Sequence, residues 1–375
     1  MRSALLCALA LLLVPAARAF WIIGHQPLVT QRFDAIVSPG GISGHAHAFV
    51  GSGAIDGSST RKSLRGAHAK GACTTTGLRA DSSSYWAPQL YRYYRNGTFA
   101  SVPLAFANTY YLPRDGPTQK KIVAFPPGLR MIGGNAMATA HETQFPAGAH
   151  PYSWVCLQTS GPSPQTDEIP HGPCPAGLRA QIIFPSCWDG KNLDSPDHTS
   201  HMSYPIGRPD GGDCPATHPV KVPVLFYEWV FAVGSGAGNG RWVLSNGDSV
   251  GYSFHGDFLE AWDTRVLQAA IDQCTGNLFG ALEKCPPFVE SGLDREAASR
   301  CTAPNLVHER AVGFNLKALP GCNVIKNGVH TGKGQPSAQC TTPPSFTTRK
   351  QDVANRKAQS RGKGVRTRMV HLRTE

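Results

Sequence analysis

The chain is poor in charge and lacks the motifs of several common protein classes. Only 16% of its 375 residues are charged, and beyond residue 19 no apolar run approaches the ~18 residues of a membrane-spanning helix. Gly-x-Ser-x-Gly and P-loop motifs are missing, so the sequence gives no support for an α/β-hydrolase or a P-loop nucleotide-binding protein. No Cys-x2-Cys pair is present, which argues against a structural zinc site. We therefore expect no membrane span in the mature chain.

The first nineteen residues have the pattern of a secretory signal peptide. Arg2 precedes an apolar run from Ala4 to Val14, and Ala17-Arg18-Ala19 provides a small-x-small cleavage site. This pattern predicts a secreted, extracellular protein with a signal peptide over 1–19, a β-rich domain over 20–342 and a basic tail over 343–375. Asn96 opens an Asn-Gly-Thr acceptor for N-glycosylation, which we expect in a surface turn.

The cysteine content agrees with export. Ten cysteines follow the signal, and an even number in an exported chain predicts disulfides. Short spacing favours the pairs Cys156–Cys174, Cys187–Cys214, Cys274–Cys285 and Cys301–Cys322, which leaves Cys73 to pair with Cys340.

The net charge of +11 is concentrated at the two ends of the chain. The signal has two arginines, and the segment 349–375 has nine basic and two acidic residues, so residues 20–348 have a net charge of only +2. A nearly neutral body gives no reason to expect nucleic-acid binding. The basic tail has too few apolar residues to fold alone, and it could either bind anionic polymers or be a solvated extension.

Short apolar runs between frequent turns indicate a mainly β fold. The 40 glycines and 30 prolines leave runs rich in Val, Ile, Phe, Tyr and Trp at 103–112, 121–126, 179–185, 222–233 and 241–245, which we expect to be strands. One helix is expected over 263–274, where Val266, Leu267, Ala270 and Ile271 form a stripe behind an Asp-Thr start. We therefore predict a single β-sandwich or jelly-roll-like domain with long loops, one or two short helices and several disulfides.

Six separated motifs resemble one family. "GHAHAFVG", "CTTTGLRADSSSYWAPQLY", "AFPPGLRMIGGN", "IIFPSCWDGKNLDSPDHTSHMSYP", "CPATHPVKVPVLFYEWVF" and "SNGDSVGYSFHGDFLEAWD" together resemble the domain-of-unknown-function family 1996 over about residues 36–290. The resemblance implies a secreted, disulfide-containing domain whose activity is not part of the family's definition. In some members the domain is joined to carbohydrate-binding modules, which suggests a polysaccharide as the partner.

Histidines and aspartates are concentrated in three of these motifs. His45 and His47 alternate, so on a strand both imidazoles leave the same face. His198 and His201 are three residues apart behind Asp194 and Asp197, and Ser195 and Pro196 suit the start of a helical turn that would present them together. The third motif supplies His255 and Asp257.

Two classes of chemistry fit these residues. Imidazole and carboxylate are ligands for zinc, manganese or iron, so His45, His47, His198 and His201 are candidate ligands of a divalent metal ion that activates water. Without a metal, one histidine could act as a base in a polysaccharide lyase, or two carboxylates could hydrolyse a glycosidic bond. The alternatives are that the aspartates only cap turns and that each histidine is a hydrogen-bonded structural residue.

Aromatic and cationic residues near these motifs are candidates for sugar binding. Flat rings cover the C–H faces of sugars, and cations neutralise uronate groups. The candidates are Tyr85, Trp86, Trp188, Arg79, Arg130 and Lys191, with Trp86 expected to be exposed at a strand edge. The alternative is that the rings belong to a sandwich core.

The sequence therefore predicts a carbohydrate-active protein that cleaves an extracellular or cell-wall polysaccharide by hydrolysis or β-elimination. The predicted catalytic residues are His45, His47, His198, His201, His255, Asp194, Asp197 and Asp257. The alternative function is a non-catalytic carbohydrate-binding or cell-wall protein that uses the same cleft for recognition. Convergence of the histidines near a carboxylate would favour the enzyme, and an exposed row of aromatic rings would favour the binding protein.

Overall fold

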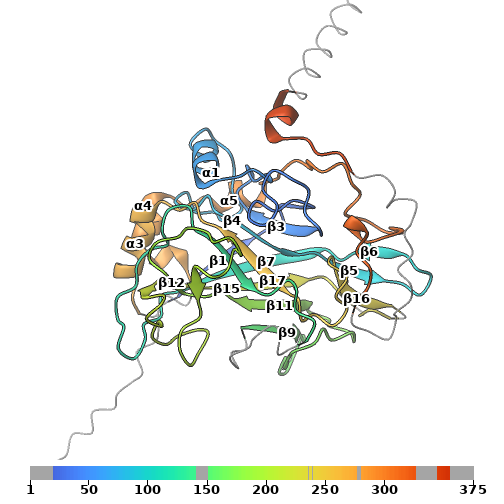
Figure 1. Ribbon diagram of the computed structural model, residues 1–375, viewed down its shortest axis with the longest axis horizontal. Helices are drawn as coiled ribbons and strands as arrows, with labels where there is room; N and C mark the ends of the chain where they lie inside the picture. The colour runs from blue at the N-terminus through green and yellow to red at the C-terminus, as the bar shows by residue number, and fades with distance from the viewer. Residues whose placement is uncertain are drawn as a thin grey trace, which may run out of the picture.

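The computed structural model describes residues 20–140, 151–234, 236–238, 240–276, 280–326 and 344–354. Within these residues the strands form four antiparallel sheets, joined by long loops and accompanied by short helices (Figure 1). The predicted mainly β fold is therefore confirmed. None of the described helices has the length and apolar character needed to cross a bilayer. The predicted signal peptide lies outside the described residues.

The larger sheet has six strands in the order β1-β7-β15-β11-β9-β10. Its members are β1 (Trp21–His25), β7 (Leu104–Leu112), β15 (Val224–Phe231), β11 (Leu178–Ile183), β9 (Tyr152–Cys156) and β10 (Gln165–Thr166).

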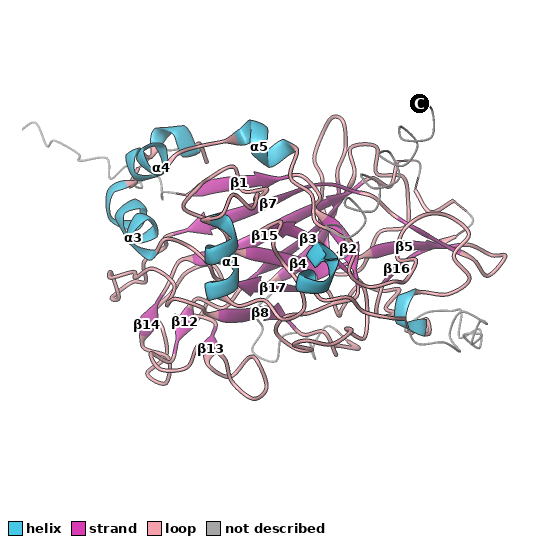
Figure 2. Cartoon of the chain, turned by 90° about the horizontal axis from the view of Figure 1, so that it is seen from above, coloured by secondary structure: helices cyan, strands magenta, loops and turns pink. Residues whose placement is uncertain are grey.

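The second sheet has five strands in the order β2-β3-β4-β17-β8, which Figure 2 shows side by side. Its members are β2 (Val29–Gln31), β3 (His47–Gly51), β4 (Ser84–Pro88), β17 (His255–Leu259) and β8 (Arg130–Gly134).

Two small sheets and several short helices complete the fold. The sheets contain β13 (Met202–Ser203), β12 (Cys187–Trp188) and β14 (Val220–Lys221), and β16 (Arg241–Leu244), β5 (Leu90–Tyr93) and β6 (Phe99–Ser101). The α-helices are α1 (Arg61–His68), α3 (Thr264–Gln273), α4 (Pro286–Ser291) and α5 (Arg295–Ser299), with 3-10 turns η1 (Leu282–Lys284) and η2 (Pro320–Cys322).

The five-stranded sheet is buried on both of its faces, and this decides where polar side chains can lie. Its inner face packs against the six-stranded sheet through aromatic contacts such as Tyr85 with Tyr227. Its outer face is covered by the loops around residues 32–60 and by α1, whose Leu64 joins Phe49 and Trp86 in a second apolar cluster (Figure 2). Any polar group on this outer face therefore has little access to water.

Most of the predicted elements are present. Four of the five expected runs overlap the strands β7, β11, β15 and β16. The expected helix is α3, with the Asp263 carboxylate accepting a hydrogen bond from the Arg265 N–H. The strand predicted at 121–126 is wrong. There the Ala124 N–H donates to the Gln268 side chain, and Pro126 has no N–H to donate to a sheet.

Three of the predicted disulfides are confirmed and two pairings are wrong. The structure has Cys156–Cys174, Cys187–Cys214 and Cys274–Cys285, but Cys301 is bonded to Cys73. Sequence proximity misled the prediction because the segment after α5 folds back onto the N-terminal loops, where the two sulfurs pack against Gly53. Cys322 is also disulfide-bonded, and Cys340 lies outside the described residues.

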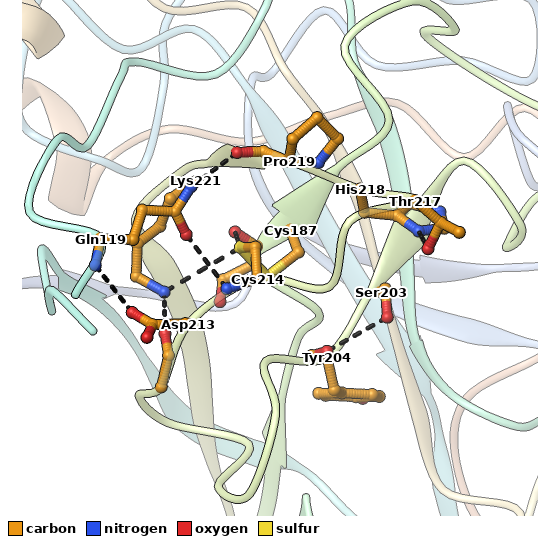
Figure 3. Close-up of a disulfide and its surroundings, with 12 residues drawn as sticks. Gln119, Cys187, Ser203, Tyr204, Asp213, Cys214, Thr217, His218, Pro219 and Lys221 are labelled. Atoms are coloured by element: carbon orange, nitrogen blue, oxygen red, sulfur yellow. Dashed lines mark hydrogen bonds between the residues drawn. A yellow bond between two sulfur atoms is a disulfide. The ribbon is translucent and has the colours of Figure 1, made fainter. Parts of the chain in front are cut away.

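The Cys187–Cys214 disulfide closes a loop that contains several of the predicted site residues (Figure 3). The Lys221 ammonium is buried beneath this loop, where it donates to the Gly212 carbonyl and lies 4.0 Å from the Cys214 sulfur. The Cys214 N–H donates to the Gln119 side chain at 3.0 Å. These contacts attach the end of the loop to β14 and to the segment that follows β7.

Described residues beyond the predicted boundary at residue 342 contact the rest of the chain. Phe346 pairs with Val307, and the Thr347 N–H donates to the Leu306 carbonyl at 2.9 Å. Residues 349–354 are helical. The first part of the predicted tail is therefore attached to the domain, and residues 355–375 lie outside the described residues.

Gly256 allows the two large sheets to approach each other next to the site residues of β17. A Cβ atom at this position would lie 2.7 Å from Phe184 Cζ and 3.0 Å from Ile182 Cγ2. We expect Gly256→Ala to lower the free energy of unfolding in urea by about 1–3 kcal/mol, because the packed core resists added volume. The control is Gly66→Ala in α1, where a Cβ meets nothing within 4 Å and better helix propensity should leave stability equal or higher. Equal effects of the two variants would contradict this account.

Candidate metal centre

Two strands and one adjoining loop bring three imidazoles and a carboxylate together on the outer face of the five-stranded sheet. His255 and Asp257 alternate on β17, so both side chains leave the same face. His47 begins β3 and His45 lies two residues earlier, so they share that direction. The strand β4 separates β3 from β17, and its Trp86 pairs with both Phe49 and Asp257. The register therefore places Phe49 opposite Asp257 across β4, and His47 and His255, each two residues earlier, lie level with each other on either side of β4.

The ligand atoms of the three imidazoles are close enough to bind one ion, and the Asp257 carboxylate lies beside His255. The Nε2 atoms of His45 and His255 are 3.3 Å apart, and His255 Nε2 lies 3.9 Å from Asp257 Oδ2. One ligand atom from each of His45, His47 and His255 lies within 4.8 Å of the others. At metal–nitrogen distances of about 2.0–2.1 Å, two nitrogens of a tetrahedral site are about 3.3–3.4 Å apart. The observed separation of the two Nε2 atoms fits such a site.

Backbone carbonyls fix two of the imidazoles in the tautomer that binds metal. His47 Nδ1–H donates to the Phe33 carbonyl at 3.1 Å, and His255 Nδ1–H donates to the Ser253 carbonyl at 2.8 Å. A carbonyl only accepts, so each Nδ1 carries the proton and each Nε2 keeps its lone pair. This second contact of the ring is the usual arrangement around metal-binding histidines.

Several buried polar atoms of the cluster have no hydrogen-bond partner. They are His47 Nε2 and both carboxylate oxygens of Asp257, on residues that are 0% and 1% exposed. A buried polar group without a partner costs about 1–3 kcal/mol, and more when it is charged. His47 Nε2 belongs to a set with the His45 and His255 nitrogens, and Asp257 belongs to a second set with His47 and Asp34, so a cation in either set would satisfy atoms that otherwise have no partner.

Burial also favours the neutral form of every imidazole in the cluster. Desolvation lowers the pKa of His47 to about 3 and that of His255 to about 4. The pKa of His45 is also well below its usual value, through loss of hydration and then through the other two imidazoles. The pKa of the Asp257 carboxyl is raised well above normal, first by burial and then by Asp34. The imidazoles are therefore ready to act as ligands, while ionised Asp257 requires a positive charge nearby.

Asp34 adds a second carboxylate that the sequence analysis missed. Asp34, His47 and Asp257 form a further set whose ligand atoms lie within 4.8 Å of one another. Asp34 Oδ1 accepts the N–H groups of Ile36 and Val37, at 2.8 and 3.0 Å. Because an imidazole nitrogen binds one ion, His47 can serve only one of the two sets at a time. Nothing in "QRFDAIVSPG" distinguishes Asp34 from an ordinary turn residue.

His198 lies near the cluster but is not one of its converging groups. Its Nδ1 bonds Asp194 Oδ1 at 2.8 Å, and Asp194 Oδ2 pairs with Arg130 Nη1 at 3.3 Å. Burial raises the pKa of Asp34, and the His198 imidazole is close enough to oppose that increase. His198 has a φ of 58°, a conformation that costs energy in a residue with a side chain.

The helical turn predicted for the segment 194–201 is wrong, because side chains cap a tighter turn there. The Asp197 carboxylate accepts the N–H groups of Thr199 and Ser200 and the Ser195 hydroxyl, which holds its pKa below the usual range. Both ring nitrogens of His201 are occupied, by the Ser195 hydroxyl at 2.9 Å and by the Arg130 carbonyl at 2.7 Å. These contacts agree with the alternative interpretation, in which Asp197 caps a turn and His201 is a hydrogen-bonded structural residue.

The residues predicted to bind sugar do not form one surface. The prediction that Trp86 is exposed is wrong, because both Trp86 and Tyr85 are completely buried. The outer face of β4 would be open in a simple sandwich, but here the loops around residues 32–60 cover it. Arg79 is exposed and lies 3.9 Å from Asp294, beside a cavity of about 370 Å³ that none of the predicted site histidines lines. Trp188 is half-buried and its indole N–H donates to the Asn192 carbonyl.

The remaining predictions concern surface positions. Lys191 is exposed on the loop closed by Cys187–Cys214, where its backbone N–H donates to Asp189. Arg130, the other cation expected to neutralise a substrate, is paired with Asp194. Asn96 is exposed in the turn between β5 and β6, as predicted, and its side chain accepts from Thr98.

A search of family profiles identifies the domain that carries this cluster. The profile of the family described as "Domain of unknown function (DUF1996)" matches residues 34–262, more than half of the chain. The chain belongs to the DUF1996 family. The four residues of the cluster and Asp34 lie inside this DUF1996 segment, whereas α3 and every later residue lie outside it. Searches of curated proteins and of solved structures gave no match.

The unpartnered carboxylate of Asp257 gives a test of the metal centre. In the presence of a chelator, we expect Asp257→Asn to leave the free energy of unfolding equal or higher, because burial raises the pKa of Asp257 and penalises its ionised form in the metal-free protein. The wild type should gain about 2.7 kcal/mol from Zn²⁺ at 100 times its Kd, and the variant should gain little. Urea unfolding with chelator and with Zn²⁺ measures both. A variant that is less stable than the wild type in chelator would mean that Asp257 has a stabilising partner.

Proposed function

We propose that the protein is a secreted metal-dependent enzyme that cleaves an extracellular polysaccharide. One observation carries the proposal: the ligand atoms of three imidazoles lie within 4.8 Å of one another, and a buried carboxylate without a hydrogen-bond partner lies 3.9 Å from one of them. His45, His47, His255 and Asp257 would hold a divalent transition metal, for which imidazole and carboxylate are suitable ligands. Such an ion supplies Lewis acidity and lowers the pKa of bound water.

The exposed side of the cluster supports a catalytic role rather than a purely structural one. His47, His255 and Asp257 are buried, whereas His45 is partly exposed, so a substrate would reach the ion past His45. A catalytic site must keep a position for substrate or water, and a zinc site can expand to five ligands, so a substrate group could bind the ion on the side of His45. His198 is the candidate acid or base, because Asp194 fixes its Nδ1 and its ring is about 25% exposed.

Export is supported by two independent features. The disulfides are of a kind that persists in oxidising compartments, and the first nineteen residues have the pattern of a signal peptide. The exposed Asn96 acceptor fits the same route. Polysaccharide as the substrate rests on the resemblance to secreted proteins, some of which carry carbohydrate-binding modules. The non-catalytic alternative has less support, because the expected aromatic platform of Tyr85 and Trp86 is buried.

Incubation with a panel of plant, fungal and bacterial polysaccharides tests the function. The purified protein, loaded with Zn²⁺, Mn²⁺ or Fe²⁺, is compared with the same protein after chelation and with His47→Ala. New reducing ends that need both the metal and His47 indicate hydrolysis, and additional ultraviolet absorbance of unsaturated uronates indicates β-elimination. If the protein bound a polysaccharide but released no product in any metal state, the proposed cleavage would be refuted and the non-catalytic binding function favoured.

A further inference from the structure

His45 is the ligand of the cluster whose position depends on a loop. His47, His255 and Asp257 belong to strands, where the ladder of hydrogen bonds fixes their direction. His45 follows the exposed residue Gly44 and lies before β3 begins. A loop residue needs support from its surroundings to hold a ligand atom in place, because its backbone is not fixed by a sheet.

Arg32 attaches this loop to the end of β2. Its Nη1 donates to the Ser43 carbonyl at 2.5 Å, and the Ser43 N–H donates back to the Arg32 carbonyl at 3.2 Å. The Arg32 side chain is only 10% exposed. The guanidinium therefore holds the backbone two residues before His45, and its own position decides where the loop lies.

Glu309 fixes the Arg32 side chain from the opposite side. Its Oε2 lies 2.5 Å from Arg32 Nε, and its Oε1 accepts the Gly321 N–H at 3.1 Å. The segment around Gly321 in turn contacts the loop directly, since a Cβ at Gly321 would lie 2.4 Å from the Gly44 carbonyl oxygen. Asn323 Nδ2 donates to the same carbonyl at 2.8 Å.

We propose that Glu309 is a positioning residue for His45, acting through Arg32 and the Ser43–Gly44 loop. Residues 309–323, which lie outside the DUF1996 segment, thereby set the metal affinity of a site whose ligands all lie inside it. The inference rests on the proposed metal centre. Glu309 also neutralises Arg32, one of the cations that contribute to the lowered pKa of His45. Without Glu309 the loop loses its anchor, and an unpaired positive charge remains near the bound ion.

Metal titration of Glu309→Gln tests this role. The matched control is Glu283→Gln, which removes an exposed carboxylate paired with Arg295 on the surface. Zn²⁺ affinity is measured by competition with a chromophoric chelator, and ligand geometry by the visible absorption spectrum of the Co²⁺-loaded protein. We expect Glu309→Gln to bind Zn²⁺ about 10–100-fold more weakly and to change the Co²⁺ spectrum, while the control matches the wild type.

The same substitution in a His45→Ala background separates positioning from general damage. If Glu309 acts through His45, then Glu309→Gln in the His45→Ala background should change the Zn²⁺ affinity by no more than about twofold. That is the limit expected for groups that no longer interact. An equal loss of affinity with and without His45, or no loss in the single variant, would overturn the inference. If Glu309→Gln does not fold, Asn323→Ala takes its place in the same cycle with the same criteria. Failure of the wild type to bind Zn²⁺ or Co²⁺ would refute the metal centre itself.

Discussion

Replacing His47 by alanine is expected to lower the affinity for Zn²⁺ by more than about 100-fold. Loss of a group that merely supports a ligand already costs about 10–100-fold, and His47 is itself a ligand with an unpartnered, buried Nε2. It also belongs to both sets of converging groups, so neither set stays complete without it. Isothermal titration or chelator competition with the metal-free protein measures the change.

The control for this prediction is His201→Ala. His201 is equally buried, but both of its ring nitrogens are hydrogen-bonded, to Ser195 and to the Arg130 carbonyl. Its replacement should lower stability by about 1–3 kcal/mol through the unsatisfied partners and leave the Zn²⁺ affinity unchanged. If the two variants lost affinity equally, the assignment of ligands within the cluster would be wrong.

Removing the Cys73–Cys301 disulfide is expected to destabilise the protein more than removing any other described one. The two cysteines are 228 residues apart, whereas Cys274 and Cys285 are 11 apart. Because a longer closed loop restricts the unfolded chain more, the expected costs are about 5 and about 3 kcal/mol. Urea unfolding of the paired serine variants, with the remaining disulfides intact, measures the difference.

The Cys73–Cys301 variant has a second expected consequence. Cys301 begins the segment that leads to Glu309 and Gly321, so the anchor of the His45 loop should also loosen. The Zn²⁺ affinity should therefore fall in the Cys73→Ser/Cys301→Ser variant and stay unchanged in Cys274→Ser/Cys285→Ser. A greater destabilisation by the short-range pair would contradict the loop-length argument.

Residue types and alternation were sufficient to predict part of the site. The spacing His45-x-His47 on a strand predicted two imidazoles on one face, and His255 and Asp257 share the same two-residue period. The sequence could not supply the strand order and register. In the sheet β4 lies between β3 and β17, but more than 160 residues of the chain separate β4 from β17. That arrangement brings the two alternating pairs together.

Two wrong predictions, the helical turn at 194–201 and the exposure of Trp86, have different physical causes. A Ser-Pro-Asp sequence can start a helix or close a turn, and the Asp197 carboxylate decides for the turn by accepting two backbone N–H groups. Trp86 has the alternation of a strand residue, but whether its face is covered depends on loops elsewhere in the chain. Short-range patterns cannot predict such coverage, and the Cys73–Cys301 pairing was missed for the same reason.

X-ray diffraction of the Zn²⁺-loaded protein, recorded on both sides of the zinc absorption edge, tests the central claim most directly. The account predicts one anomalous peak per chain, at about 2.0–2.2 Å from the Nε2 atoms of His47 and His255 and from an Asp257 oxygen. His45 should complete the set from its loop. A protein that crystallises with Zn²⁺ in excess, yet shows no peak among these residues and keeps the Asp257 carboxyl without a cation, would contradict the account.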